Sequence, residues 1–259
     1  LMERIAPLGV SWNCLAVVDV ADDEALLRDM AAAGCGSILV GFESLDSAGL
    51  REARKRNARV EEYGPAVDRI HAAGIHAIGA FVVGFDSDTP ETFDRIAAFA
   101  RDHHLSYVML NILTAFPGTA LHARMSAEGR LLDVEPERMN GLHATVRHPT
   151  MTAGEIQGRY WETLGKLYSY EELLPKAMAV IGNGRFRARN PGIGFRDKAR
   201  GTASLIARYM WGGGRPGRRM LRDLMSLRAR GLAPTEVIVE YLLFGAAANL
   251  YRDRNAPGG

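Results

Sequence analysis

The stretch that most constrains the fold is Ala77–Phe93, with the sequence AIGAFVVGFDSDTPETF. Its apolar first half predicts a strand that is buried on both faces, as the strands of parallel sheets are. Gly84 ends this run, and an acidic turn leads to a helix that Asp88 or Thr89 can cap. In parallel α/β proteins such a strand-to-helix junction lies at the carboxyl ends of the strands, where ligands bind.

The same order of strand, turn and helix recurs along the first half of the chain. Four strands are predicted, at Val10–Val18, Ser37–Phe42, Ala77–Val83 and Tyr107–Leu113. The predicted helices that follow or separate them are Asp22–Ala33, Leu45–Asn57, Tyr63–Ala73, Pro90–His103 and Ala120–Glu128. Repeated βα units favour a parallel sheet with right-handed crossovers, and their spacing is typical of a βα barrel. A closed eight-stranded barrel would need four more units, which the sequence after residue 130 does not supply.

The second half instead predicts an α-helical extension. Its helices are expected at Thr152–Tyr168, Glu171–Ile181, Phe195–Tyr209, Pro216–Arg230 and Pro234–Arg252. We therefore predict an α/β partial barrel over residues 1–135 and a helical extension over 136–259. Charge supports two parts: residues 1–150 carry 14 Lys and Arg against 21 Asp and Glu, a net −7, and residues 151–259 carry 18 against 9, a net +9. The basic half, with the Arg-rich loop Arg185–Arg200, is expected to face an anionic group or an acidic partner domain.

Composition excludes several classes of protein. The sequence has no run of about 18 apolar residues, so no transmembrane segment is predicted. It also has no aromatic-basic motif of the kind that predicts nucleic-acid binding. Cys14 and Cys35 are too few for a disulfide framework and favour a reducing, cytoplasmic setting. The seven histidines show no metal-ligand spacing.

Polar residues follow several predicted strands. Asp19, the Glu43–Ser44 pair and Asp86 come where strands end, and at a barrel rim such groups face a shared pocket. Each could instead cap the next helix, but the set together favours a binding site. The turn from Phe116 to Thr119 directly follows a strand, so we expect a ligand-facing loop, although Pro-Gly is also a common turn dipeptide.

Three stretches of the chain resemble a known family in order and spacing. AAAGCGSILVGFES (Ala31–Ser44), AGIHAIGAFVVGFDSDTPETF (Ala73–Phe93) and LTAFPGTALHARMSAEGRL (Leu113–Leu131) resemble the later part of radical S-adenosylmethionine (SAM) enzymes, in particular the cobalamin-binding branch. Trp12 with Asp19, and Arg51–Asn57 (REARKRN), fit the same pattern. The resemblance implies a six-stranded partial (β/α) TIM-like barrel, of which this chain would form the last four βα units.

The resemblance also implies SAM-binding positions at the strand ends. These are Glu43 and Ser44 near the ribose and methionine moieties, Val82, Gly84 and Asp86 at the adenine, Leu113, Thr114 and Phe116 at the adenine edge, and Asp19 at a strand end that varies in the family.

One feature of that family is missing. The 4Fe–4S cluster, held in radical SAM enzymes by a C-x-x-x-C-x-x-C loop, has no counterpart in a chain with two cysteines. The cluster loop and the first two barrel strands are therefore expected upstream of Leu1, or the chain is a degenerate relative that has lost catalysis. In the first case the strand Val10–Val18 has an unpaired edge, and the isolated chain is expected to aggregate.

The leading hypothesis is the SAM-binding half of a radical SAM enzyme, a methyltransferase or related carbon-skeleton modifier, with cobalamin as an expected further cofactor. Its partners would be a small-molecule or lipid-like substrate and the N-terminal segment of the same protein, with the helical half as a lid. Two alternatives remain open: a non-catalytic interaction module, and an ordinary TIM-barrel enzyme that uses Glu43 and Asp86 as acid and base.

Overall fold

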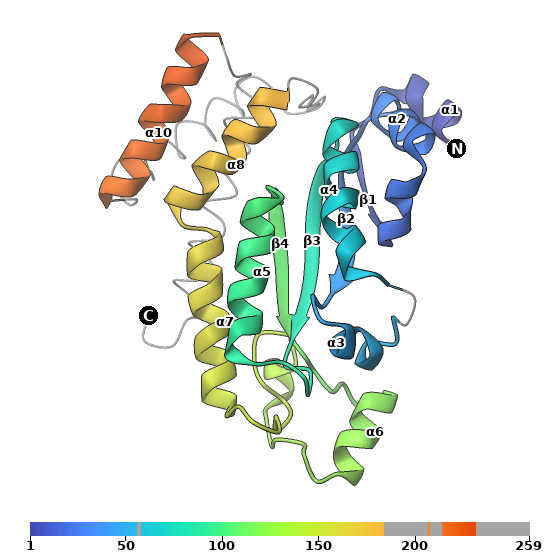
Figure 1. Ribbon diagram of the computed structural model, residues 1–259, viewed down its shortest axis with the longest axis vertical. Coiled ribbons are helices and arrows are strands. Elements are labelled where there is room, and N and C mark those ends of the chain that lie inside the picture. The colour runs from blue at the N-terminus through green and yellow to red at the C-terminus, as the bar shows by residue number, and fades with distance from the viewer. Residues whose placement is uncertain (56–57, 184–206, 208–213, 232–259) are drawn as a thin grey trace.

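A four-stranded parallel sheet forms the centre of the computed structural model, which describes residues 1–55, 58–183, 207 and 214–231 (Figure 1). Its strands are β1 (Trp12–Ala16), β2 (Cys35–Glu43), β3 (His76–Val83) and β4 (Tyr107–Ile112), in the spatial order β1-β2-β3-β4. The predicted α/β class with parallel βα units is confirmed. Each strand lies beside the preceding one, as in βα barrels, and closure into a partial barrel stays a prediction.

The helices follow the predicted order with small shifts at their ends. They are α1 (Met2–Ile5), α2 (Glu24–Ala32), α3 (Ser47–Glu52), α4 (Tyr63–Ala72), α5 (Pro90–Asp102), α6 (Ala120–Ala127), α7 (Ala153–Leu167), α8 (Tyr170–Asn183) and α10 (Gly214–Ala229). Short 3₁₀ helices lie at Ala6–Leu8, Val18–Asp22, Val60–Glu62 and Pro136–Arg138. The predicted helices Phe195–Tyr209 (except Ala207) and Pro234–Arg252, and the loop Arg185–Arg200, lie outside the described residues.

One helix is shorter than its sequence predicts. The expected helix Leu45–Asn57 ends in α3 at Glu52, because Arg54 takes a left-handed backbone conformation with φ 61°. The Lys55 amide then donates to the Leu50 carbonyl, which closes the last helical turn.

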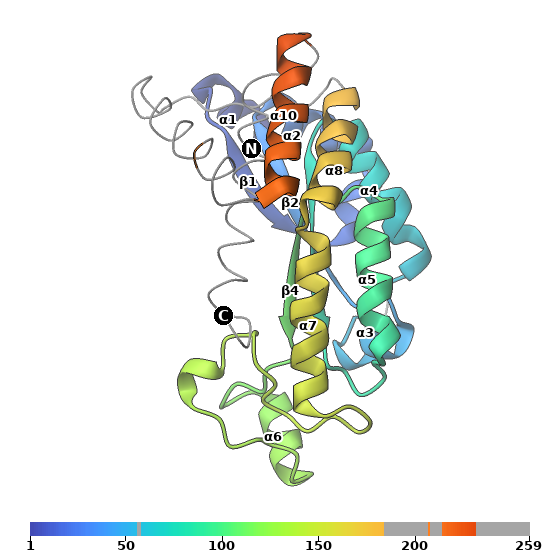
Figure 2. The same cartoon turned by 90° about the vertical axis from the view of Figure 1, so that its left-hand side faces the viewer.

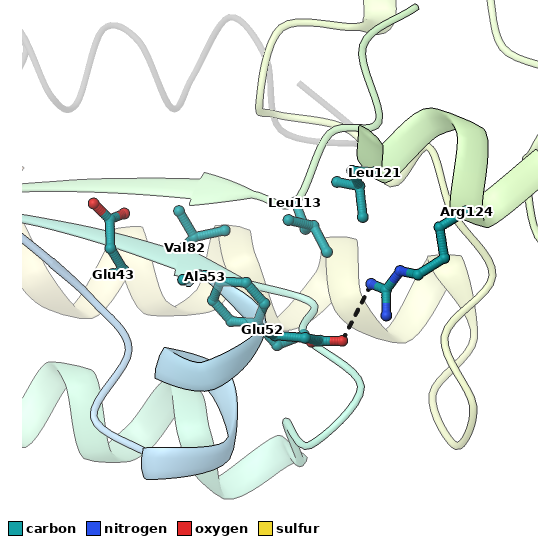
Figure 3. Close-up of a pocket in the computed structure, with 8 residues that line it drawn as sticks. Glu43, Glu52, Ala53, Val82, Leu113, Leu121 and Arg124 are labelled. Atoms are coloured by element: carbon teal, nitrogen blue, oxygen red, sulfur yellow. Dashed lines mark hydrogen bonds and ion pairs between the residues drawn. The ribbon is translucent and has the colours of Figure 1, made fainter. Parts of the chain in front are cut away.

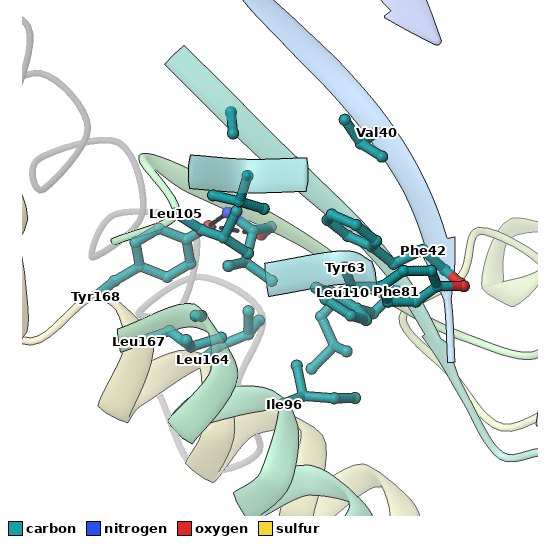
Figure 4. Close-up of a cluster of buried hydrophobic side chains, with 14 of the residues drawn as sticks. Val40, Phe42, Tyr63, Phe81, Ile96, Leu105, Leu110, Leu164, Leu167 and Tyr168 are labelled. Carbon is teal, nitrogen blue, oxygen red and sulfur yellow. Dashed lines mark hydrogen bonds between the residues drawn. The ribbon is translucent and has the colours of Figure 1, made fainter. Parts of the chain in front are cut away.

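The core lies between one face of the sheet and its helices. Ile38, Val40 and Phe42 of β2 alternate inward and are fully buried, and β3 does the same with Phe81. The rings of Phe42 and Tyr63 have centroids 4.7 Å apart, and those of Phe42 and Phe81 are 5.4 Å apart (Figure 4). These aromatic contacts fasten α4 to the centre of the sheet.

The opposite face of the sheet is much more exposed. Leu15 of β1 is 81% exposed and Met109 of β4 is 42% exposed, although both are large apolar residues. α6 lies beyond the strand ends and does not cover this face (Figure 1). The sheet therefore has one packed face and one open, partly apolar face.

The outer edge of β4 is closed by the side chain of Tyr168, the C-cap of α7, and by the backbone of Gly141. The Tyr168 hydroxyl donates to the Val108 carbonyl at 2.6 Å and accepts from the Val108 amide at 3.0 Å. Further along the same strand, the Ile112 amide donates to the Gly141 carbonyl at 2.6 Å. These bonds satisfy backbone groups that another strand would use, so the sheet ends at β4.

The helical half continues from this edge. α7 packs against α5 and β4, α8 follows it, and α10 packs against α8 (Figure 2). A helix from the predicted extension, α7, therefore packs on a strand of the predicted barrel. The division of the chain into two parts at residue 135 stays a proposal. None of the described helices combines the length and apolar character that a membrane crossing would require.

Candidate functional site

A pocket of about 280 Å³ lies at the carboxyl ends of the strands (Figure 3). Its lining comes from separate segments of the chain: Glu43, Glu52, Ala53, Val82, Phe85, Leu113, Leu121 and Arg124. The apolar side chains lie along its middle, with Glu43 towards one end and the Glu52–Arg124 pair at the other. This is the edge of a parallel sheet at which ligands bind in α/β proteins.

Glu43 enters the pocket through a strained backbone. It is one of the few described non-glycine residues with positive φ, at 65°, and the register of β2 against β3 is shifted between Gly41 and Glu43. Lys55 forms an ion pair with Glu43 at 3.3 Å and donates to the Gly41 carbonyl. A Cβ on Gly41 would lie 2.8 Å from the Glu43 carboxylate, so a larger residue there would push this carboxylate out of its present position. Such strain is typical of functional sites.

The turn after β3 is held by a buried carboxylate. Asp88 accepts hydrogen bonds from the Gly84 amide at 2.7 Å and the Phe85 amide at 3.0 Å. Burial raises the pKa of Asp88 to about 6. Thr89, not Asp88, caps α5, in a capping box with Thr92. Asp88 therefore fixes the turn that places Phe85 in the pocket wall.

Two arginines connect the rim of the pocket to this turn. Arg130 forms a two-pronged ion pair with Asp86, at 2.5 and 2.9 Å, and its hydrogen bonds lower the pKa of Asp86. Arg124 lies 3.4 Å from one carboxylate oxygen of Glu52, while the other oxygen of Glu52 accepts from the Asp86 amide at 2.9 Å. These four residues form one network that joins α3, the turn after β3, α6 and the residues directly after α6.

The segment between α6 and α7 is tied to the same turn. His148 donates from Nε2 to the Phe85 carbonyl at 2.7 Å, since its Nδ1 accepts from the Met151 amide at 3.0 Å. A small apolar cluster of Ala115, Met125 and Val146 packs α6 against this segment. The pocket wall is thus built from parts that are far apart in the sequence.

The structure brings together three of the nine predicted SAM-binding residues. Glu43, Val82 and Leu113 line the pocket, each from the end of a different strand. Gly84, with φ 99°, lies between the lining residues Val82 and Phe85 in the chain.

The other five predicted residues lie around the pocket without lining it. Ser44 is buried and accepts from the Asp46 amide, Asp86 pairs with Arg130, and the Thr114 hydroxyl donates to the Ile112 carbonyl. Phe116 is 48% exposed, and Asp19 is exposed. Burial and the charges of Glu43 and Asp19 raise the pKa of Tyr63 to about 12. The roles assigned to these residues stay predictions.

Five lining residues were not predicted: Glu52, Ala53, Phe85, Leu121 and Arg124. All of them lie inside stretches that carry the family resemblance, and that was the available signal. Their convergence depends on contacts such as Glu52 with Arg124, which are 72 residues apart.

Neither cysteine lies in the pocket lining. Cys14 is partly buried on β1 and Cys35 is buried on β2, where burial raises its pKa to about 12. Across the described part of the chain, no three His, Cys, Asp or Glu side chains form a group that could hold a metal ion.

A comparison with protein families identifies the second half of the chain. Residues 119–248, half of the sequence, match the model of a domain of unknown function, DUF4070. The chain belongs to the DUF4070 family. In the structure this segment begins at Thr119, the N-cap of α6, so the DUF4070 segment supplies Leu121 and Arg124 to the pocket.

Curated relatives of this DUF4070 protein carry names of methyl-transferring enzymes. It is 31% identical over 157 residues to the uncharacterized methyltransferase sll1242 of Synechocystis, covering 61% of this chain and 29% of the relative. It is 28% identical over 151 residues to bacteriochlorophyllide d C-12(1)-methyltransferase of Chlorobaculum tepidum, covering 54% and 33%. It is 26% identical over 163 residues to hopanoid C-2 methylase of Rhodopseudomonas palustris, covering 63% and 30%. The chain spans about a third of the length of these relatives.

Proposed function

We propose that this chain forms the SAM-binding wall of a radical SAM methyltransferase. The observation that carries the proposal is the convergence of Glu43, Val82 and Leu113, from three strand ends, on one pocket. The family resemblance assigns these positions to SAM. Relatives named as methyltransferases and a methylase support the reaction class. Methyl transfer that depends on cobalamin is part of the proposal for the whole protein.

The pocket suits a nucleoside with an attached polar chain. Val82, Phe85 and Leu113 offer apolar surface to a base, and the carboxylate of Glu43 can accept hydrogen bonds from ribose hydroxyls. The Glu43–Lys55 ion pair fixes the direction of that carboxylate before a ligand arrives. The role of this chain is therefore to bind and orient SAM.

The residues present do not fit a 4Fe–4S cluster. The sequence has two cysteines where the family's motif uses three, and both are on strands away from the pocket. We propose that the cluster, which supplies the reductive cleavage of SAM in this family, is held by residues outside this sequence. The free thiols support a reducing compartment, for which we propose the cytoplasm.

The two edges of the sheet support an additional strand from the same protein. β4 is closed by Tyr168 and Gly141, whereas β1 is an edge strand that carries the exposed Leu15. We propose that an N-terminal segment of the protein pairs with β1.

The acid–base alternative has less support. Asp86 pairs with Arg130 and does not line the pocket, so Glu43 and Asp86 do not face a common substrate position.

SAM binding by the full-length protein tests the proposal. We expect isothermal titration calorimetry to detect binding of SAM to the wild-type protein. Val82→Trp should abolish this binding, because the indole would fill the pocket. Met225→Trp, at a 41% exposed position on α10, is the matched control and should bind normally. Equal SAM affinity of both variants would overturn the proposal. Formation of 5′-deoxyadenosine under anaerobic reduction then tests the reaction.

A further inference from the structure

α6 forms one wall of the pocket but packs little against the rest of the protein. The helix lies beyond the carboxyl ends of the strands (Figure 1), and its side chains Leu121 and Arg124 line the pocket (Figure 3). Met125 is the one buried residue of this helix, and most of the others are exposed. The attachment of α6 therefore depends on few contacts.

The packing of Met125 is separate from the main core. Met125 is 1% exposed and packs with Ala115 and Val146, to which Leu121 and Leu131 add partly buried surface. These five residues form a cluster of their own and do not belong to the main core of the sheet. Regions with few buried apolar contacts open at low free-energy cost. This cluster can thus separate without disturbing the sheet.

Polar contacts add little to the attachment of α6. Within the described part of the chain, a single hydrogen-bonded ion pair joins residues 119–128 to residues outside 116–130. It is the contact of Arg124 with Glu52, at 3.4 Å. The side chain of Arg124 is 41% exposed, and partly exposed pairs of this kind contribute little stability. The Met125 cluster is therefore the main fastening of α6.

The chain is fixed on both sides of α6. Before the helix, the Ala115 amide donates to the Thr145 hydroxyl at 3.1 Å. After it, Arg130 donates to the Asp86 carboxylate and, at 2.8 Å, to the Arg147 carbonyl. Any movement of α6 must therefore take place between these two fixed points.

A glycine lies between each fixed point and the helix. Gly118 and Gly129 have φ values of 82° and 66°, and no atom lies within 4 Å of the place that a Cβ on either would take. Glycine changes its backbone angles at little steric cost, and here it has open space in which to do so. The two glycines are therefore suited to act as hinges.

We propose that residues 118–129 form a lid that rotates about Gly118 and Gly129 to admit the ligand of the pocket. The structure has the closed position, in which Leu121 and Arg124 complete the pocket wall and the Met125 cluster holds the lid. Opening moves both side chains away from the strand ends. The inference rests on the proposed function in taking SAM as the ligand.

The motion is measured first, in the full-length protein without ligand. Relaxation dispersion of methyl-¹³C methionine follows the Met125 methyl group on the timescale of lid motions, and buried Met220 of α10 is the internal reference. Val146→Ala weakens the cluster from outside the lid and leaves the probe in place. Val67→Ala, in the main core on α4, is the matched control.

We expect conformational exchange at Met125 and none at Met220. Because Val146→Ala removes buried methyl groups that hold the closed position, it should raise the open population about fivefold. Val67→Ala should leave that population unchanged.

Surface plasmon resonance then measures the association and dissociation of SAM. If the ligand enters and leaves only while the lid is open, both rate constants follow the open population. Val146→Ala should therefore raise both by about fivefold and leave Kd nearly unchanged. A variant that merely damages the pocket would speed dissociation without speeding association.

The possible failures can be told apart. The lid is overturned if Met125 shows no exchange in wild type and in Val146→Ala, or if Val146→Ala changes the dissociation rate alone. The proposed function fails if SAM does not bind wild type. If Met125 still exchanges in that case and responds to Val146→Ala, the lid stands and the ligand that it admits is not SAM.

Discussion

Replacing Tyr168 with phenylalanine tests how the sheet ends. The hydroxyl of Tyr168 makes two hydrogen bonds, to the amide and the carbonyl of Val108, and it is buried. Phenylalanine keeps the ring, so the change removes these bonds without creating a large cavity. Each orphaned backbone group costs about 1–3 kcal/mol, and with partial relaxation we expect the free energy of unfolding to fall by about 2–4 kcal/mol.

Urea denaturation followed by circular dichroism measures this loss, and amide hydrogen exchange localises it. The Val108 amide should exchange at least about tenfold faster in Tyr168→Phe, corresponding to roughly 1.4 kcal/mol of lost protection. Met109 pairs with Ala80 of β3 and provides the internal reference. Tyr63→Phe is the matched control, because it loses one bond, at 3.2 Å, and should cost about 1 kcal/mol.

A loss below about 0.5 kcal/mol with unchanged exchange at Val108 would refute the reasoning. It would mean that the edge of β4 is satisfied by something other than Tyr168, such as a further strand.

Three further predictions concern the turn after β3 and the helical half. Gly84→Ala should lower the free energy of unfolding, measured in urea, by about 1–2 kcal/mol. The cost comes from backbone strain, since φ is 99°, and not from a clash, since the nearest atom to the new Cβ, Leu113 Cβ, is 3.6 Å away. Burial raises the pKa of Asp88 in the folded protein to about 6, above the roughly 3.9 of an aspartate in an unfolded chain, so its contribution to stability grows as pH falls from 7 to 4. The free energy of unfolding of wild type relative to Asp88→Asn should therefore rise by roughly 2–3 kcal/mol over this range, and a flat difference would contradict this. Burial lowers the pKa of Lys176 to about 8, so stability relative to Lys176→Met should rise between pH 8 and 10.5, as thermal melts across that range will test.

The sequence was sufficient to predict the sheet because its signals are local. The apolar run before Gly84 defines β3, and the residues after it define the start of α5, both within a few positions of the structure. The early end of α3 was not predictable in this way, since Arg54 adopts a left-handed conformation that its side chain does not signal.

The pocket was predictable only in part. Strand order implies that Glu43, Val82 and Leu113 share one edge, and they do. The pairing of Glu52 with Arg124 depends on how α3 and α6 come together, and no local pattern encodes that distance. Charged side chains on short helices are also common on solvated surfaces, so their type alone does not mark them as part of a site.

The family boundary at Thr119 passes through the small cluster that holds α6, with Ala115 before it and Met125 and Val146 after it. A gene fragment cut at that boundary would encode Arg124 without Glu52 and leave an apolar surface unmatched on each piece. The segments before and after Thr119 should therefore be transferred together when parts of related proteins are exchanged. Swaps intended to change ligand selectivity should replace α6 together with the strand ends that face it.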